Sequence, residues 1–219
     1  MRSDGLDFPR FSSAIASVVG ATALGLNEVG DELVDPLVAP ALGQNFSDLL
    51  GSLYLIAACG MFAGQSLTNL SKRLPGDRAV DARPASLIGC GVIALTLIAL
   101  SRISPASTVP VINLATFTDT AGVLRTGIFW STIIVTAVLV FAAASLGLRD
   151  HGIHGQLAAM CVAGGTSAIV AAYVLSRLLL DHDQMSAWLD CYGQWWTVPG
   201  LIGITIAGIL GMPRCVRTD

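Results

Sequence analysis

The feature that most constrains this chain is a set of long apolar runs whose only charged residues lie near the ends of the runs. Five strong runs occupy residues 46–64, 86–103, 127–148, 156–180 and 195–212. Each is close to the roughly 20 residues that an α-helix needs to cross the hydrocarbon core of a bilayer. Because a lipid-embedded backbone must satisfy its own hydrogen bonds, such runs form helices. The sequence therefore predicts an all-α, polytopic membrane protein.

A sixth, weaker run covers residues 11–27 and is rich in Ala, Ser and Gly. Its alternative interpretation is a cleaved signal peptide, since the Ala-Thr-Ala sequence at 21–23 has the small residues of a cleavage site. Two acids offset two arginines among the first ten residues, so the segment lacks the net positive charge of a signal peptide. We therefore predict a retained first span and a bundle of about six spans.

Composition limits what lies outside the bilayer. Charged residues make up only 12% of the chain, against about 25% in ordinary soluble domains. Six spans of about 20 residues each would use roughly 120 positions, which leaves room for loops and tails only. We predict a single integral membrane domain over residues 1–219, surrounded by lipid and without a nucleic-acid partner.

The distribution of Lys and Arg predicts the orientation, because cytoplasmic loops are enriched in these residues. With six spans and the N-terminus inside, nine of the twelve lie on the inner side. Arg102, Arg125 and Arg177 fall outside, close to span ends, where a long side chain can snorkel to the headgroups. Nine of the fifteen acids lie outside. These distributions predict that both termini are cytoplasmic, in a multi-pass protein of the plasma membrane.

Acidic residues on the predicted outer side are the main candidate site. The first four acids after residue 27 follow i, i+3, i+4 and i+7 spacing, which places them on one face of a helix. Close carboxylates repel one another, and binding a cation or keeping a proton relieves that repulsion. The candidate cation or substrate vestibule comprises Glu28, Asp31, Glu32, Asp35, Asp48, Asp181, His182 and Asp183. The alternatives are an interfacial helix with its acids in water and, for Asp48, a helix-capping role.

Two connecting segments have distinct compositions. The predicted inner loop at 65–85 is basic and contains Pro and Gly, as a solvated turn does. The predicted outer loop at 104–126 is longer and only moderately polar. Its alternative interpretation is a shallow re-entrant segment, which would have to be buried in protein or line water.

Small residues spaced four apart let membrane helices approach closely. Gly60 and Gly64 have this spacing near the end of the second span, and Gly203, Ala207 and Gly211 have it in the last. These seams serve either helix packing within one chain or a surface for a second copy or another membrane protein. Hydroxyl side chains inside the spans are expected to bond back to helix carbonyls.

The common catalytic motifs are missing from the sequence, including GxSxG, HExxH and the Walker loop. The five cysteines show no metal-ligand spacing. We predict a protein that is not an enzyme and that uses no cofactor or metal. The leading expectation is a transporter or channel for a small solute or cation. The alternatives are a sensor or assembly subunit, and a lipid-modifying membrane enzyme.

Four features of the first half of the chain occur together: a small-residue first span, an acid-rich outer loop, the sequence NFSDLL at 45–50, and a basic Pro-containing inner loop. In this layout the chain resembles a poorly characterised group of actinobacterial multi-span membrane proteins assigned to transport. The resemblance implies a transport role and identifies no functional residues.

Overall fold

The computed structural model describes residues 18–19, 30–42, 44–73, 80–105, 108, 119–151, 155–181, 183–184, 187, 202 and 206. Within this part of the chain the structure is helical and contains no strand. The long helices are α3 (Phe46–Ser71), α4 (Arg83–Ile103), α5 (Thr120–His151) and α6 (Gly155–Leu180). All four are long and apolar enough to cross a membrane. They confirm the all-α, multi-pass prediction for four spans.

Two of the six predicted spans, 11–27 and 195–212, lie outside the described residues except at Val18, Val19, Ile202 and Ile206. The predicted number of six spans therefore stays a prediction. Before α3, the described chain forms a π-helical turn, η1 (Gly30–Val34), that leads directly into the short helix α2 (Asp35–Leu42).

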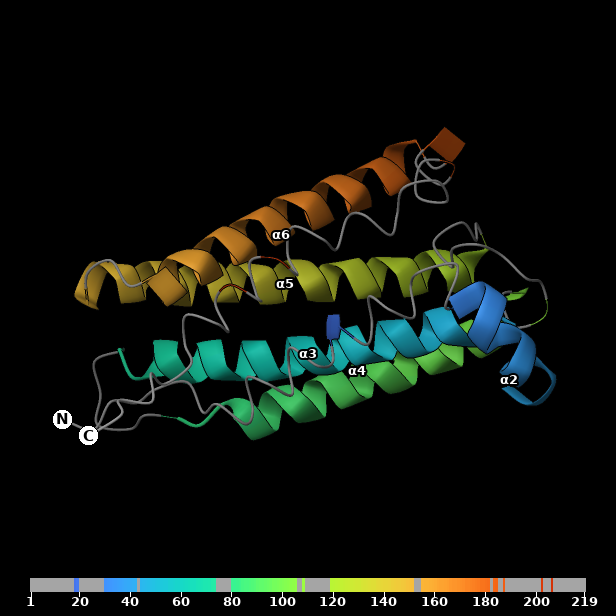
Figure 1. Cartoon of the computed structure of the whole chain (residues 1–219), viewed down its shortest axis with the longest axis horizontal. Coiled ribbons are helices and arrows are strands. Elements are labelled where there is room, and N and C mark those ends of the chain that lie inside the picture. Colours follow the sequence, from blue (N-terminus) through green and yellow to red (C-terminus); the bar gives the residue numbers. More distant parts are fainter. Residues whose placement is uncertain are drawn as a thin grey trace, which may run out of the picture.

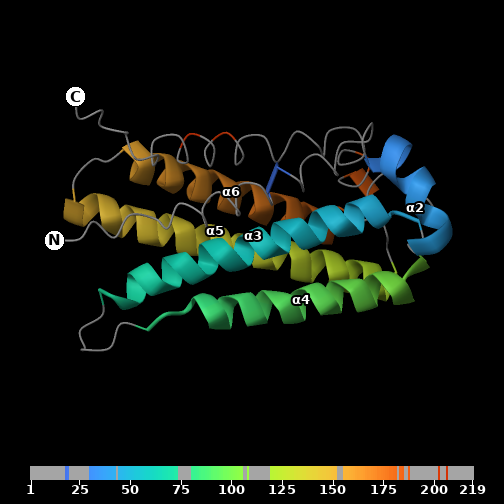
Figure 2. The same cartoon turned by 60° about the horizontal axis from the view of Figure 1, so that its bottom comes forward.

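The four long helices lie side by side along the length of the molecule (Figure 1). Helix α3 contacts α4 and α5, α4 also contacts α5, and α6 packs on α5 (Figure 2). Helix α5 therefore touches all three other long helices. One end of the bundle contains α2, the starts of α3 and α5, and the last turns of α4 and α6. We call it the α2 end. The opposite end, where α3 and α5 finish and α4 and α6 begin, is the basic end.

Helix α3 continues to Ser71, about two turns beyond the predicted end at residue 64. Polar side chains in this extension bond within the helix: Thr68 Oγ1 donates to the Gly64 carbonyl at 2.8 Å, and Gln65 Nε2 donates to Asn69 Oδ1 at 3.3 Å. The prediction that residues 65–71 belong to a loop is therefore wrong. The connection to α4 is shorter than expected, from 72 to 82.

Helix α5 begins at Thr120 and not at Gly127. Asp119 stabilises this start, because its Oδ2 accepts the backbone N–H of Gly122 at 3.2 Å. Its Oδ1 accepts the Ser104 hydroxyl at 2.9 Å and so ties the end of α4 to the start of α5. Residues 120–126 of the predicted outer loop are therefore helical. Residues 106–107 and 109–118 of that loop lie outside the described part of the chain.

The predicted small-residue seam in α3 is an intrachain contact. A Cβ at Gly64 would lie 2.9 Å from the Cα of Arg83, and one at Gly60 would lie 3.1 Å from the Cβ of Cys90. The Ser86 hydroxyl also donates to the Gly60 carbonyl at 3.0 Å. Gly60 and Gly64 thus pack against α4 within the chain, as the first of the two predicted uses of this seam requires. Gly203, Ala207 and Gly211 lie outside the described residues.

Helix α6 approaches α5 in the same way. A Cβ at Gly164 would lie 2.9 Å from both the Ala137 carbonyl oxygen and the Phe141 nitrogen. Ala163 and Ala171, on the same side of α6, are buried. Small residues thus set the spacing of α6 on α5, as expected for helices that gain little from apolar burial in lipid.

The outer surface of the bundle is apolar. Large side chains of α4 are exposed along its length, with Ile88 and Leu95 each 69% accessible. An exposed apolar surface of this extent is typical of contact with lipid. The hydroxyls of Thr96, Thr132 and Thr166 each donate to the carbonyl four residues earlier, which confirms the predicted back-bonding.

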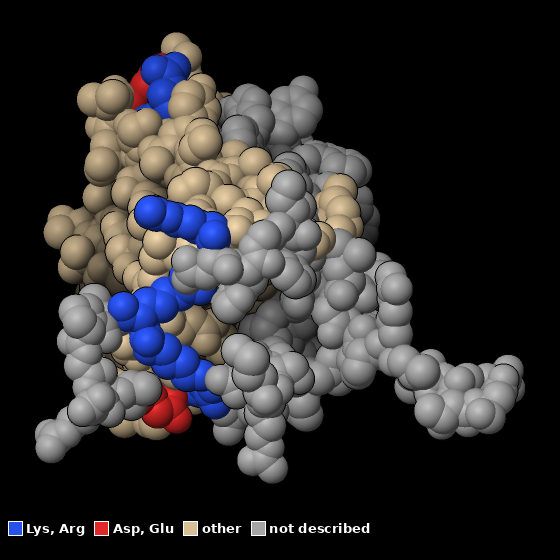
Figure 3. All heavy atoms as spheres, turned by 90° about the vertical axis from the view of Figure 1, so that its left-hand side faces the viewer, with Lys and Arg blue, Asp and Glu red and all other residues tan. Residues whose placement is uncertain are grey.

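Charged side chains divide between the two ends. Figure 3 looks onto the basic end, where Lys and Arg dominate the described charges. These cations are Lys72, Arg73, Arg83 and Arg149, with Asp81 the acid among the described side chains there. The described acids at the α2 end are Glu32, Asp35, Asp48, Asp119, Asp181 and Asp183, against Arg102, Arg125 and Arg177. The structure thus separates the charges by end. Which end faces the cytoplasm stays a prediction.

Candidate functional site

Polar side chains are buried between the helices at the α2 end. Those less than a tenth exposed are Asp35, Asn45, Ser47, Ser101, Ser104, Arg125 and Thr126. They belong to α2, to the start of α3, to the end of α4 and to the first turns of α5. We call this set, together with Asp48 and Ser52 of α3, the buried polar cluster. Its members range from residue 35 to residue 126, so only the folded bundle assembles it.

Arg125 is the largest member of the buried polar cluster. The rise of 1.5 Å per residue places it about 8 Å along α5 from Thr120. Its side chain is only 5% exposed, and its Nη2 donates to the Ser52 hydroxyl of α3 at 3.1 Å. The prediction that Arg125 snorkels to the headgroups is therefore wrong. The guanidinium points across to α3, because Ser52 and Asp48 offer an acceptor and an opposite charge there.

The Ser52 hydroxyl, which Arg125 contacts, itself donates to the Asp48 carbonyl at 2.8 Å. The half-buried Asp48 carboxylate is close enough to interact electrostatically with Arg125. Such an interaction is stronger between helices than in water, because the local dielectric is low. Asp48 and Arg125 therefore place two opposite charges at one site between α3 and α5.

The hydrogen bonding of the buried polar cluster is incomplete. Arg125 Nε has no hydrogen-bond partner in the described part of the structure. The same is true of the buried hydroxyls of Ser47, Ser101 and Thr126. Leaving a buried polar group unpaired costs about 1–3 kcal/mol. The α2 end therefore contains a buried charged donor and buried hydroxyls whose hydrogen-bonding capacity is unused within the described residues.

Asp35 has a structural role in the cluster. Its Oδ1 accepts the backbone N–H of Ser47 at 2.8 Å, so it caps the first turn of α3 from twelve residues away. Between them, Asn45 adopts a left-handed conformation with φ of 57°, which Asn tolerates better than most residues. A carboxylate at a helix N-terminus also complements the helix dipole. The cap that the structure shows for α3 is thus Asp35, whereas the sequence suggested Asp48.

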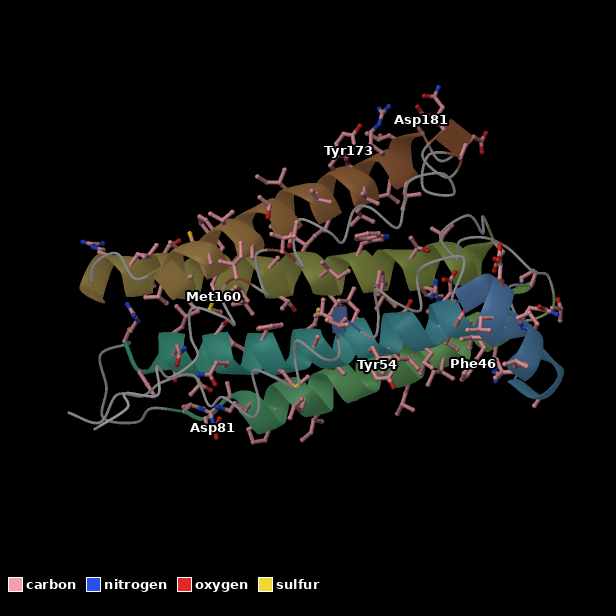
Figure 4. The ribbon with its side chains drawn as sticks, viewed as in Figure 1. Phe46, Tyr54, Asp81, Met160, Tyr173 and Asp181 are labelled. Carbon is pink, nitrogen blue, oxygen red and sulfur yellow. The ribbon has the colours of Figure 1, made fainter. Side chains whose placement is uncertain are left out.

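The structure describes five of the eight side chains of the predicted acidic vestibule. Asp35 and Asp48 join the buried polar cluster, whereas Glu32 and Asp183 are exposed. Asp181 pairs with Arg177 at 3.6 Å on the last turn of α6. Figure 4 shows Asp181 well away from Phe46, which marks the start of α3. Glu28, His182 and the side chain of Asp31 lie outside the described residues.

Metal-ligating side chains do not gather in the described structure. Among the described residues, no three His, Cys, Asp or Glu side chains come together as they would around a metal ion. The described cysteines Cys59, Cys90 and Cys161 are free. The chemistry at the α2 end is instead that of a buried cation that bonds to the Ser52 hydroxyl and interacts electrostatically with the Asp48 carboxylate.

The sequence pattern singles out Asp48 but misses Arg125. The sequence context of Arg125 could have revealed it: Val123 and Leu124 precede the arginine, and Ile128 and Phe129 follow it within about one turn. An arginine with apolar residues on both sides lies inside an apolar segment, where a charge needs a partner. Ser101 and Thr126 carry no comparable signal, because isolated hydroxyls are common in membrane helices.

A comparison of the chain with protein-family models, curated proteins and solved structures finds no match. The resemblance to actinobacterial transport-type proteins therefore stays a prediction. The function must be inferred from the site itself, within a chain whose four long apolar helices are those of a multi-pass membrane protein.

Proposed function

We propose that this chain is a membrane transport protein that binds a small polar solute at the buried polar cluster. The supporting observation is Arg125, a permanently charged side chain that is 5% exposed between apolar helices and keeps one unpaired donor. A buried ion pair seldom stabilises a fold better than apolar residues of similar size. Charged residues inside membrane segments commonly mark the pathways of solutes and ions.

The position of the cluster supports a site reached from one side. Arg125 lies about 8 Å from the start of α5 at the α2 end. Farther along α5 the buried residues are mostly apolar, with Ala137, Val140 and Ala144 beside a single described buried hydroxyl, that of Thr136. The α3–α4 contact at Gly64 is also tight enough to exclude a Cβ. A solute therefore enters from the α2 end, and its passage requires the basic end to open.

The charge of the α2 end supports the capture of a solute that bears positive charge. Six described acids at this end face three arginines, one of which, Arg177, is paired with Asp181. A surplus of one sign around a site raises the local concentration of oppositely charged groups. This agrees with the sequence-based expectation of a small solute or cation drawn to an acidic face.

The proposal is tested by uptake into vesicles. Proteoliposomes containing the full chain are incubated with a small-molecule extract of cells, and the captured compounds are identified by mass spectrometry. We expect at least one compound to accumulate with the wild type and not with R125Q. The matched control is R102Q, which makes the same change at an exposed arginine on the last turn of α4.

Two results would count against the proposal. Capture no greater than in protein-free vesicles, for every compound, would remove transport as the function. Capture that R125Q leaves unchanged would remove the buried polar cluster as its site. The alternative of an assembly subunit loses one of its supports, because Gly60 and Gly64 pack within the chain.

A further inference from the structure

We infer that the ligand of the buried polar cluster is a zwitterion with a carboxylate and an ammonium group, as in an amino acid; this inference rests on the proposed transport function. The first step is the unpaired donor, Nε of the buried Arg125. A guanidinium presents its N–H groups in a planar fork that matches the two oxygens of a carboxylate. The carboxylate end of the ligand therefore binds at Arg125.

The second step is the charge balance of the site. Arg125 bonds to Ser52, one turn after Asp48 on α3, which brings these two opposite charges together, whereas the Asp35 carboxylate of the cluster caps the start of α3. A simple anion or cation beside Ser52 would leave one charge of the Arg125–Asp48 pair uncompensated. An uncompensated charge in a low-dielectric region is costly. A ligand with one charge of each sign leaves the Arg125–Asp48 pair balanced. Its carboxylate pairs with Arg125, and its ammonium group lies on the Asp48 side.

The third step is the composition of the α2 end. The acids that outnumber the cations at the α2 end disfavour the approach of a free carboxylate and favour an ammonium group. Three buried hydroxyls, those of Ser47, Ser101 and Thr126, have no partner among the described residues. A hydroxyl donates one bond and accepts two, so it serves a carboxylate and an ammonium group equally.

Binding to the detergent-solubilised full chain tests the inference. The twenty common amino acids are screened by thermal shift, first in pools and then singly, and binding is confirmed by titration calorimetry. The amino acid that binds is next compared with its methyl ester, which lacks the carboxylate charge, and with its deaminated acid. We expect both analogues to bind at least about tenfold more weakly, because each loses a charge-assisted contact.

Variants assign each end of the ligand to a residue. R125Q and R125K should weaken binding of the amino acid by about tenfold or more, since Lys keeps the charge but not the fork. D48N should weaken binding of the amino acid but not of the deaminated acid. R102Q should leave both unchanged, because Arg102 is exposed and outside the cluster. If R125Q fails to fold, the ester and the deaminated acid still test the inference on the wild type.

The inference is overturned if no amino acid binds, or if the ester or the deaminated acid binds as well as the parent compound. Its failure differs from that of the proposed function. Vesicle uptake of a sugar or a metal cation without amino-acid binding would leave transport standing and remove the zwitterion. Saturable, Arg125-dependent binding of an amino acid without uptake would support the zwitterion and remove transport as the function.

Discussion

The two ends of the bundle use similar residue types, but their hydroxyl groups are satisfied to different degrees. At the basic end, Thr68 Oγ1 donates to the Gly64 carbonyl at 2.8 Å and accepts the Ala82 N–H at 3.0 Å. Ser71 donates to the Val80 carbonyl at 3.0 Å. These bonds close the turn between α3 and α4, where the buried Arg83 Nε has no hydrogen-bond partner among the described residues but lies 3.6 Å from Asp81 Oδ1. At the α2 end, Arg125 and three hydroxyls keep unpaired buried atoms in the described structure.

This difference separates a structural junction from a candidate site. Helix packing explains the hydroxyls at the basic end, because each has a backbone partner across the turn. It does not explain Arg125, whose burial costs free energy that one bond to Ser52 only partly offsets. An incomplete polar network inside an apolar bundle is therefore the more informative feature.

The largest expected effect concerns the side of the membrane that each end faces. Leu37→Cys and Val80→Cys each place a thiol at an exposed position, one at each end. With Cys191 and Cys215 changed to Ser, an impermeant maleimide should label only Leu37→Cys in intact cells, since the basic end is predicted to be cytoplasmic. Labelling of both would contradict the assignment of the ends to opposite faces. Labelling of Val80→Cys alone would reverse the predicted orientation.

The next effect concerns the tight seam near the basic end. Gly64→Val should lower the free energy of unfolding by about 3 kcal/mol, because its Cβ would meet the Arg83 backbone at 2.9 Å. Gly89→Val is the control, since nothing lies within 4 Å of a Cβ there. Unfolding in mixed micelles with increasing SDS measures both. Equal losses would show that helix propensity, and not the seam, decides the effect.

Thr68→Val should cost about 2 kcal/mol, because it leaves the Ala82 N–H without its acceptor. The matched control is Thr96→Val, whose hydroxyl bonds only to the carbonyl four residues earlier. The same unfolding measurement applies, and amino-acid binding should be unchanged in both variants. A loss of amino-acid binding in Thr68→Val would contradict the assignment of binding to the α2 end alone.

At the α2 end, Asp35→Ala should cost about 1 kcal/mol, the usual value of a helix cap, because the Ser47 N–H loses its acceptor. The exposed Glu32→Ala, in the turn before α2, should change the unfolding free energy by much less. If Glu32→Ala proved as costly as Asp35→Ala, general acidity and not the cap would stabilise this end.

The smallest stability effect is expected where the functional effect is greatest. The double variant D48N/R125M removes both charges. Its free energy of unfolding should lie within about 1 kcal/mol of the wild-type value or above it, because buried ion pairs rarely add net stability. Binding and uptake should be abolished. A large loss of stability in this variant would make the buried polar cluster structural, like the basic end.

The sequence predicts most of the helices but not where they end. Apolar runs identify α3 to α6 because burial in lipid requires such runs. The last turns of α3 escape this reasoning, since hydropathy does not register that Thr68 and Gln65 satisfy their polar groups within the helix. The early start of α5 escapes it too, because Asp119 and Arg125 resemble loop residues until their partners are known.

The candidate site could be predicted only in part. Asp48 is visible in the sequence as an acid at the start of an apolar run. Its relation to Arg125 is not, because Arg125 bonds to Ser52, which lies 73 residues away on α3. That pairing depends on how α3 packs on α5, and no local pattern determines this packing.

The order of the helices has a consequence for biosynthesis. The chain is made from its N-terminus, so α3 with Asp48 and Ser52 is synthesised before α5 brings Arg125 to the membrane. An arginine about 8 Å inside a helix is costly to insert alone, but here its acceptor and its counter-charge are already made. Insertion of α5 should therefore depend on α3, and a chain lacking Asp48 and Ser52 should release α5 from the translocon more slowly.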